Sequence, residues 1–112
     1  VGDQMGCPTY AQDIARSIVE IIPQLNSREY NGIYHYCGDQ PCSWYEFAQT
    51  IFELSQIEAS ISPISSKDYN APAARPGYSV MQSGRFKELG LSPLRSWKLA
   101  LEEYLQERKA KQ

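Results

Sequence analysis

The sequence predicts a small α/β fold, mostly helical with two or three short strands, in a single domain that spans residues 1–112. Residues 9–22, 43–55 and 96–105 carry apolar side chains at the spacing of amphipathic helices. Two shorter runs, 32–36 and 57–64, have the aromatic, β-branched or alternating pattern of strands. Because two strands alone are marginally stable in water, we expect their edges to pair with other parts of a longer protein, of which this chain is a fragment.

The composition limits the kind of partner. Hydrophobic residues make up 42% and charged residues 21%, as in soluble globular proteins, and the net charge is −2. A nucleic-acid surface normally needs a clustered basic face, and the basic cluster Arg108, Lys109 and Lys111 is typical of a solvated helix end. No apolar run approaches the roughly 20 residues that span a bilayer. Three cysteines, an odd number, favour a reducing, cytoplasmic compartment. We therefore expect no nucleic acid and no membrane as partners.

The first predicted helix begins at Thr9 and ends before Pro23. Thr9 and Gln12 have the spacing of a capping box, in which each side chain satisfies a backbone N–H group at the helix start. We expect the apolar side of this helix to face the core; its residues are Ala11, Ile14, Ala15, Ile18 and Ile22.

A short strand is predicted over residues 32–36, followed by a turn at 38–41. Ser43 and Glu46 form a second capping box, which predicts a helix from Ser43 to about Ser55. The residues expected on the inner face of that helix are Tyr45, Ala48, Phe52 and Trp44.

The C-terminal half is expected to begin with an edge strand over 57–64, which ends near Pro63. Residues 65–79 lack periodicity and predict a long loop, a kind of segment that is often functional. A short helix over 83–89 should end at Gly90, and Ser96 should cap a last helix. The core side of that helix is expected to hold Trp97, Ala100, Leu101, Tyr104 and Leu105.

Two loops carry the residue types of a binding site. In residues 3–10, glycines and Pro8 shape the backbone, while Gln4 and Thr9 offer polar groups. In residues 74–81, Arg75 presents a planar, permanently charged fork that suits a phosphate, on a backbone stiffened by proline. At the first loop, the local sequence alone is equally compatible with a plain capped helix start. At the second loop, it favours a plain surface arginine at position 75.

Both loops resemble the C-terminal, substrate-binding part of the dTDP-4-dehydrorhamnose reductase family, which are extended short-chain dehydrogenases/reductases. The motifs are Asp-Gln-x-Gly-x-Pro-Thr at 3–9 and Ala-x-Arg-Pro-x-Tyr-Ser at 73–79. Segments 32–38, 43–48 and 96–101 are similar to the strand, turn and helices of the same lobe. The resemblance thus covers most of the chain.

The resemblance implies the C-terminal lobe of an enzyme with a Rossmann-type N-terminal domain. That enzyme would reduce dTDP-4-dehydro-L-rhamnose to dTDP-L-rhamnose in dTDP-rhamnose biosynthesis, for cell-surface polysaccharide. NADPH or NADH would bind the N-terminal nucleotide-binding domain, which would also be a partner of this lobe, and the parent could be a homodimer. Arg75 would bind the diphosphate of a dTDP-sugar. The other residues expected around the substrate are Gln4, Gly6, Pro8, Thr9 and Tyr78.

The chain lacks the glycine-rich turn that receives a dinucleotide and the Tyr-x-x-x-Lys pair that the family uses as proton donor and partner. Tyr104 with Arg108 comes nearest, but arginine cannot take the role of a lysine whose pKa can be lowered. We therefore expect no catalytic residue and an inactive fragment. His35 is not expected to be catalytic, and both tryptophans, Trp44 and Trp97, are expected to pack rather than to stack on bases.

We predict no metal site. A structural zinc needs four Cys/His ligands, and His35 is the chain's single histidine. Some reductases of this family hold magnesium at a subunit contact, to which Glu103 or Glu107 could correspond. At the first helix, however, Gln12, with Asp13 beside it, stands where another carboxylate is expected, and an amide is a poor substitute.

Two alternatives to the reductase stay open at this point. One is the lobe of a related sugar-nucleotide epimerase or dehydratase, which would share the fold and change the reaction. The other is the lobe of a non-catalytic regulatory subunit that uses the reductase fold for binding.

Overall fold

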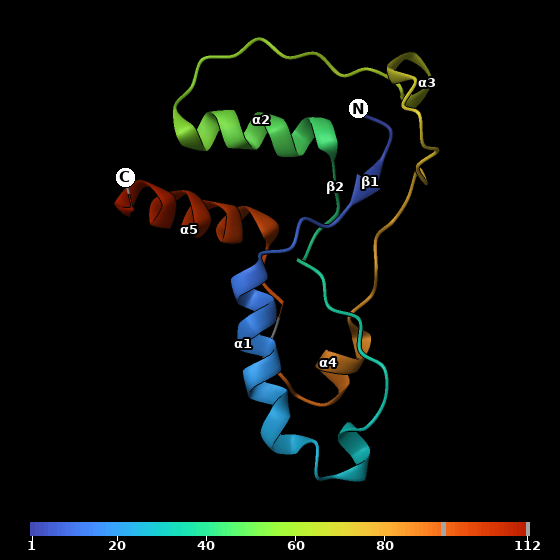
Figure 1. Ribbon diagram of the computed structural model, residues 1–112, viewed down its shortest axis with the longest axis vertical. Coiled ribbons are helices and arrows are strands. Elements are labelled where there is room, and N and C mark those ends of the chain that lie inside the picture. The colour runs from blue at the N-terminus through green and yellow to red at the C-terminus, as the bar shows by residue number, and fades with distance from the viewer. Residues whose placement is uncertain (93, 112) are drawn as a thin grey trace.

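The computed structural model describes residues 1–92 and 94–111 as an elongated molecule of 51 × 36 × 21 Å. Helices α2 (Trp44–Ser55) and α5 (Trp97–Ala110) lie side by side at one end (Figure 1). At the other end lie α1 (Ala11–Ile21) and the short α4 (Gly84–Glu88). The remaining elements are α3 (Ser66–Tyr69) and two 3₁₀ turns, Ile22–Gln24 and Arg28–Tyr30. The helix-rich α/β character is as predicted.

The two strands that the structure describes are not the predicted ones. β1 (Met5–Gly6) pairs antiparallel with β2 (Cys42–Ser43), so that Met5 lies opposite Ser43 and Gly6 opposite Cys42. The predicted strands at 32–36 and 57–64 are wrong, because both segments run extended without a ladder partner among the described residues. Ile33 is 81% and Ile57 55% exposed, whereas Tyr34 and Tyr36 pack edge to face on the buried Phe86, so the first run keeps an inward side without forming a ladder.

β1 is bonded on its other side as well. Met5 forms a parallel bridge with Tyr78, in which the Met5 N–H donates to the Gly77 carbonyl at 2.8 Å and the Ser79 N–H to the Met5 carbonyl at 2.9 Å. Residues near 5, 43 and 78 therefore form one small three-segment unit, although they are far apart in the sequence. This unit positions the candidate site described below.

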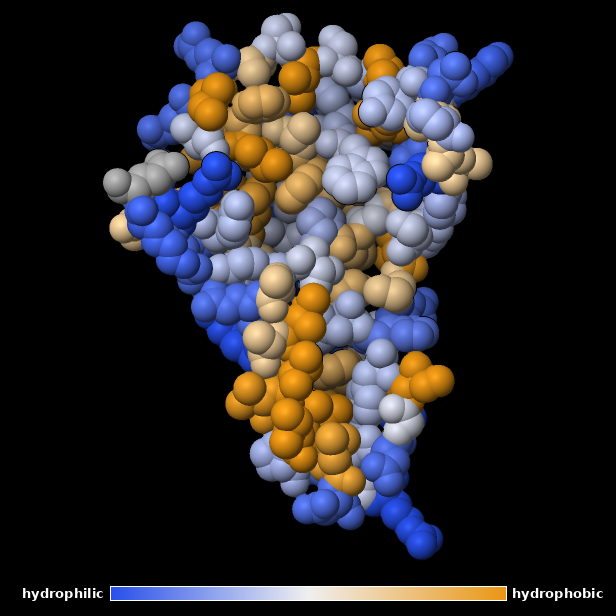
Figure 2. Space-filling model, viewed as in Figure 1, coloured by the Kyte–Doolittle hydropathy of each residue, from blue (hydrophilic) through white to orange (hydrophobic). Residues whose placement is uncertain are grey.

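Helix α1 is reversed relative to the prediction. Its apolar residues are exposed, including Ile18 at 49%, whereas Asp13 and Ser17 are its buried residues. Figure 2 shows apolar side chains gathered on the end of the molecule that α1 occupies in Figure 1. The predicted cap is also wrong: the helix starts after Tyr10 without a side-chain cap, because the Thr9 hydroxyl bonds elsewhere.

Ion pairs explain why the polar side of α1 faces inward. The Arg95 guanidinium donates to both carboxylate oxygens of Asp13, at 2.8 and 2.7 Å, and also to Glu103 on α5. Arg16 donates to Asp13 at 3.1 Å and to Glu103 at 2.8 Å. These hydrogen bonds from Arg16 and Arg95 lower the pKa of Glu103. The network joins α1 to α5 through charges, a pattern that apolar periodicity does not reveal.

The apolar core lies where α2 and α5 meet. Its buried residues are Cys42, Trp97 and Leu101. The predicted core side of α5 is confirmed at Trp97 and Leu101, but Tyr104 is 42% exposed. On α2 the face that packs on this core was not the predicted one; its residues are Phe47, Ile51 and Leu54.

Several predicted local signals are confirmed. The capping box of α2 is complete, since the Ser43 hydroxyl accepts from the Glu46 N–H and the Glu46 carboxylate accepts from the Ser43 N–H. Ser96 caps α5 by accepting from the Lys98 N–H. Gly90 follows α4 with φ +66°, a conformation that favours glycine. Cys37 and Cys42 are buried and free, as expected for packed thiols.

Candidate functional site

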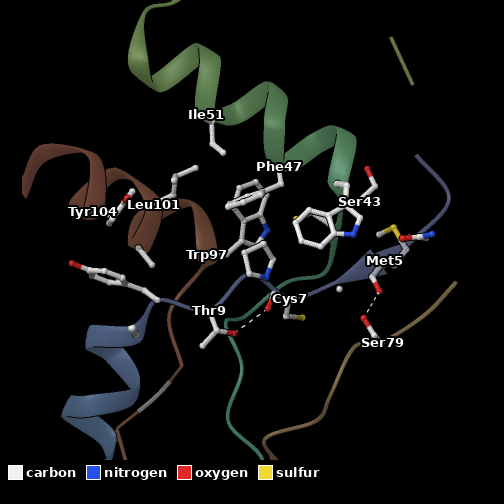
Figure 3. Close-up of a pocket in the computed structure, with 18 of the residues that line it drawn as sticks. Met5, Cys7, Thr9, Ser43, Phe47, Ile51, Ser79, Trp97, Leu101 and Tyr104 are labelled. Atoms are coloured by element: carbon white, nitrogen blue, oxygen red, sulfur yellow. Dashed lines mark hydrogen bonds between the residues drawn. The ribbon is translucent and has the colours of Figure 1, made fainter. Parts of the chain in front are cut away.

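A cavity of about 970 Å³ opens where β1, the start of α1, α2, α5 and the loop at 75–79 meet (Figure 3). Both predicted loops contribute to its wall, together with apolar side chains of the two helices. The lining includes Gln4, Thr9, Trp44, Phe47 and Arg75. A hollow of this size that combines apolar walls with a few polar groups is typical of a small-molecule site.

The backbone pairing around β1 explains how the two loops come together. Because Met5 bonds to Gly77 and Ser79, the segment that contains Arg75 runs directly beside the segment that contains Gln4. The Ser79 hydroxyl adds a bond to the Met5 carbonyl at 3.1 Å, drawn in Figure 3. Arg75 itself is exposed and lines the cavity, so its charge is available to a ligand there.

Gln4 is held from a third segment. Its side-chain amide donates to the Ser66 hydroxyl at 2.9 Å, and that hydroxyl in turn donates to the Asp3 carboxylate at 2.7 Å. The Ser66 hydroxyl and N–H are hydrogen-bonded to Asp3 and lower the pKa of its carboxyl group. These bonds tie Gln4, on the cavity wall, to the N-terminus of α3. Gln4 is therefore oriented by the protein rather than free to rotate.

Thr9 and Pro8 serve the loop itself. The Thr9 hydroxyl donates to the Cys7 carbonyl at 3.0 Å and accepts from the Gly38 N–H at 2.9 Å, which ties the loop to the segment before β2. Pro8 lies so close to Gly38 that a side chain at position 38 would collide with the Pro8 carbonyl oxygen. Both residues reach the cavity wall, but their observed contacts are structural.

Of the two remaining predicted site residues, one lines the cavity and the other does not. Gly6 lines the cavity within β1, and a Cβ there would lie 3.2 Å from the Ser79 hydroxyl, so a larger residue would press on the neighbouring segment. Tyr78 takes part through its backbone bridge to Met5, and its side chain is 66% exposed. Tyr78 is not among the described residues that line the cavity, in contrast to our expectation that it shapes the pocket.

An aromatic wall was not predicted. The rings of Trp44, Phe47 and Trp97 meet edge to face in sequence, with centroid distances of 6.4 and 5.7 Å. Trp97 is 3% exposed, as predicted, whereas Trp44 is 62% exposed, so the expectation that both tryptophans are packed is wrong for Trp44. The sequence signal that could have revealed the exposure of Trp44 is its position in the first turn of a capped helix, where a side chain can project beside the helix end.

The thiols and the Tyr10 hydroxyl that line the cavity do not have pKa values suited to proton transfer near neutral pH. Burial, with Cys37 nearby, raises the pKa of the Cys7 thiol to about 11, and burial, with Glu46 nearby, raises that of Cys42 to about 11. The Tyr10 hydroxyl donates to Glu107 at 2.8 Å, which raises its pKa to about 12. These groups are neutral at pH 7, and the site is suited to binding rather than to acid–base chemistry.

The described part of the chain holds no group of three or more His, Cys, Asp or Glu side chains that could bind a metal ion. Within the same residues, no helix combines the length and the apolar character that crossing a membrane requires.

A family model, the RmlD substrate binding domain, matches residues 1–110. The chain is 41% identical over 108 residues to the spore coat polysaccharide biosynthesis protein SpsK of Bacillus subtilis (strain 168), covering 96% of this chain and 36% of that protein. It is 35% identical to a probable dTDP-4,6-dihydroxy-2-methyloxan-3-one 4-ketoreductase of Streptomyces antibioticus and 36% identical to a dTDP-4-dehydrorhamnose reductase of Streptomyces griseus. Each alignment covers 92% of this chain and 34% of the relative, so the chain spans about a third of their length.

Two crystal structures share the fold. A dTDP-4-dehydrorhamnose reductase from Clostridium acetobutylicum ATCC 824 matches with a TM-score of 0.88 and 34% identity, over 97% of this chain and 38% of that one. A dTDP-4-dehydrorhamnose reductase from Bacillus anthracis str. Ames in complex with NADP matches with a TM-score of 0.82 and 34% identity, over 95% of this chain and 36% of that one. The architecture described above is therefore that of a lobe within longer proteins of this kind.

Proposed function

This chain belongs to the RmlD substrate binding domain family, and on that premise we propose that it is the substrate-binding lobe of an NAD(P)H-dependent dTDP-4-dehydrorhamnose reductase. The complete enzyme would convert dTDP-4-dehydro-L-rhamnose to dTDP-L-rhamnose for the synthesis of a surface polysaccharide. Support comes from the reductase names among the relatives and from the match over nearly the whole chain.

One observation carries the proposal. Arg75 and Gln4 are 71 positions apart (75 − 4), yet the backbone bonds of Met5 to Gly77 and Ser79 bring their segments to the wall of one cavity. A diphosphate needs a fixed cation and directional donors, which an arginine fork and a held amide supply. We assign Arg75 to the diphosphate and Gln4 to a polar group of the same ligand.

The work of the reaction would be divided between two domains. The nicotinamide cofactor, when bound by the N-terminal nucleotide-binding domain, supplies the hydride for the 4-keto carbon. A tyrosine of that domain would protonate the resulting oxygen. The residues of this chain would bind the nucleotide sugar, orient it and exclude water from one side, since ligands commonly lie between domains. On this proposal the lobe alone is inactive, and its partner is the N-terminal domain of the same chain. The complete reductase would work in the cytoplasm and could form a homodimer.

Binding is testable on the isotopically labelled chain. We expect dTDP-L-rhamnose, and not UDP-glucose, to shift amide signals at residues 4–9 and 75–79. Arg75→Ala should weaken binding about 10- to 100-fold, because a charge-assisted bond is worth about 1.5–3 kcal/mol. Arg28→Ala, at an exposed arginine on a 3₁₀ turn away from the cavity, is the matched control. Equal losses in both variants, or no shifts at these two segments, would reject the proposal.

The complete protein separates an enzyme from a regulatory subunit with the same fold. In an enzyme, Arg75→Ala should reduce kcat/KM for dTDP-4-dehydro-L-rhamnose by the same factor as the binding loss. A complete protein that binds dTDP-L-rhamnose but shows no turnover with NADPH or NADH would favour the regulatory alternative.

A further inference from the structure

We infer that Trp44 is the platform on which the pyrimidine base of the bound nucleotide stacks. This inference rests on the proposed function, because it assigns a part of the same ligand to the same cavity. It concerns a residue that lies outside the two loops that carry the family motifs, on the first turn of α2.

The surface of Trp44 is free and its position is fixed. Its side chain lines the cavity that Arg75 also lines, and it is 62% exposed, the property of a ring face that a ligand can cover. The capping box of Ser43 and Glu46 sets the start of α2, with a bond of 2.7 Å from the Ser43 N–H to the Glu46 carboxylate. A preorganised ring loses little freedom when a ligand stacks on it.

The neighbouring rings support Trp44 from within. Phe47 meets the indole edge to face at 67°, and Phe47 in turn meets the buried Trp97 at 72°. The edge-to-face contact restrains the tilt of the indole, and the 62% exposure of Trp44 leaves much of its surface open to a ligand. The row of three rings therefore runs from the buried Trp97 to the cavity and ends in the exposed indole of Trp44.

The chemistry of the ligand selects a base for that face. The names of the relatives in Streptomyces antibioticus and Streptomyces griseus share the dTDP group but differ in the sugar attached to it. A lobe common to these proteins is best suited to read the shared part, which consists of a diphosphate and a thymidine. Arg75 accounts for the diphosphate, and an exposed indole accounts for the planar, weakly polar thymine, because nucleobases stack on aromatic side chains.

Trp44 can be followed directly, since the chain has two tryptophans and Trp97 is buried. With excitation at the red edge of the indole band, dTDP should quench the Trp44 emission, whereas inorganic pyrophosphate, which has no base, should not. Trp44→Leu should remove the quenching and weaken dTDP binding about 5- to 100-fold. Trp44→Phe should keep most of the affinity. Tyr69→Leu, at a 59% exposed aromatic residue on α3, is the control and should leave both readouts unchanged.

The outcomes separate this inference from the proposed function. If dTDP binds and Arg75→Ala weakens it, but Trp44→Leu leaves affinity and quenching unchanged, the stacking role is overturned and the proposed function stands. If dTDP does not bind at all, both fail. Should Trp44→Leu not fold, the unmodified chain decides, because dTDP that binds without quenching the Trp44 emission would overturn the stacking role. A fall in affinity with Trp44→Phe as large as that with Arg75→Ala would instead contradict a role that any aromatic ring can fill.

Discussion

Arg95→Met should destabilise the fold strongly, because it leaves the Asp13 carboxylate without its two-pronged partner. The Asp13 side chain is 11% exposed, and Arg95 bonds both of its oxygens at 2.8 and 2.7 Å. Removing one member of a buried ion pair costs about 3–5 kcal/mol. Arg95 is itself 30% exposed and Arg16 still reaches Asp13, so we expect a loss of about 2–3 kcal/mol in the free energy of unfolding.

Urea denaturation measures this loss as a shift of the midpoint by about 1–2 M, with the slope unchanged. The matched control is Arg16→Met, since Arg16 contacts the same two carboxylates but is 54% exposed; it should cost less than about 1 kcal/mol. Asp13→Asn in the Arg95→Met background should recover part of the loss, because it removes the buried charge. Equal costs for the two arginines would refute the reasoning that the less exposed Arg95, with two bonds to Asp13, carries most of the pairing.

Three further predictions concern the loop, the ion pairs and a thiol. Gly38→Ala should cost about 1–3 kcal/mol in urea unfolding because its Cβ meets the Pro8 carbonyl, whereas Gly84→Ala, with open space around it, should change stability by less than about 1 kcal/mol. The folded-state pKa of Glu103 is lowered from 4.5, so its stabilising contribution is present above that pH and is lost as pH falls through the lower folded value; unfolding curves from pH 7 to 3 should show this, and a flat profile would contradict it. Cys7, with a pKa near 11 instead of 9.0, should react with iodoacetamide at pH 7.5 about a hundredfold more slowly than an unperturbed thiol, and fast labelling by mass spectrometry would count against its burial.

The helices and their caps could be predicted where the signal is local. Ser43 with Glu46 and Ser96 each form bonds within one helical turn, so residue type and spacing suffice to find them. The strands could not be predicted, because β1 and β2 are two residues each and depend on partners 36 positions apart (42 − 6) or more. The segment 32–36 has strand-forming residues but finds no ladder among the described residues, which shows that pairing decides more than propensity.

The candidate site shows the same division. The motifs at 3–9 and 73–79 identified Gln4 and Arg75 as candidates, but only the backbone bonds around Met5 bring them to one cavity. The orientation of α1 was predicted in reverse, because periodicity locates an apolar face without telling which neighbour covers it. In this chain the ion pairs of Asp13 hold the opposite face inward. Trp44 was misjudged for a related reason, since a large aromatic residue is usually buried.

The three-segment unit around Met5 couples ligand binding to folding. Its bonds span up to 74 positions, from Met5 to Ser79, so the chain must close large loops before the cavity exists. A ligand that touches two of these segments binds the folded state and not the unfolded one. At a concentration 100 times its Kd, it would add about 2.7 kcal/mol to the free energy of unfolding. Melting curves recorded with a series of nucleotide sugars would thus rank their affinities without any turnover.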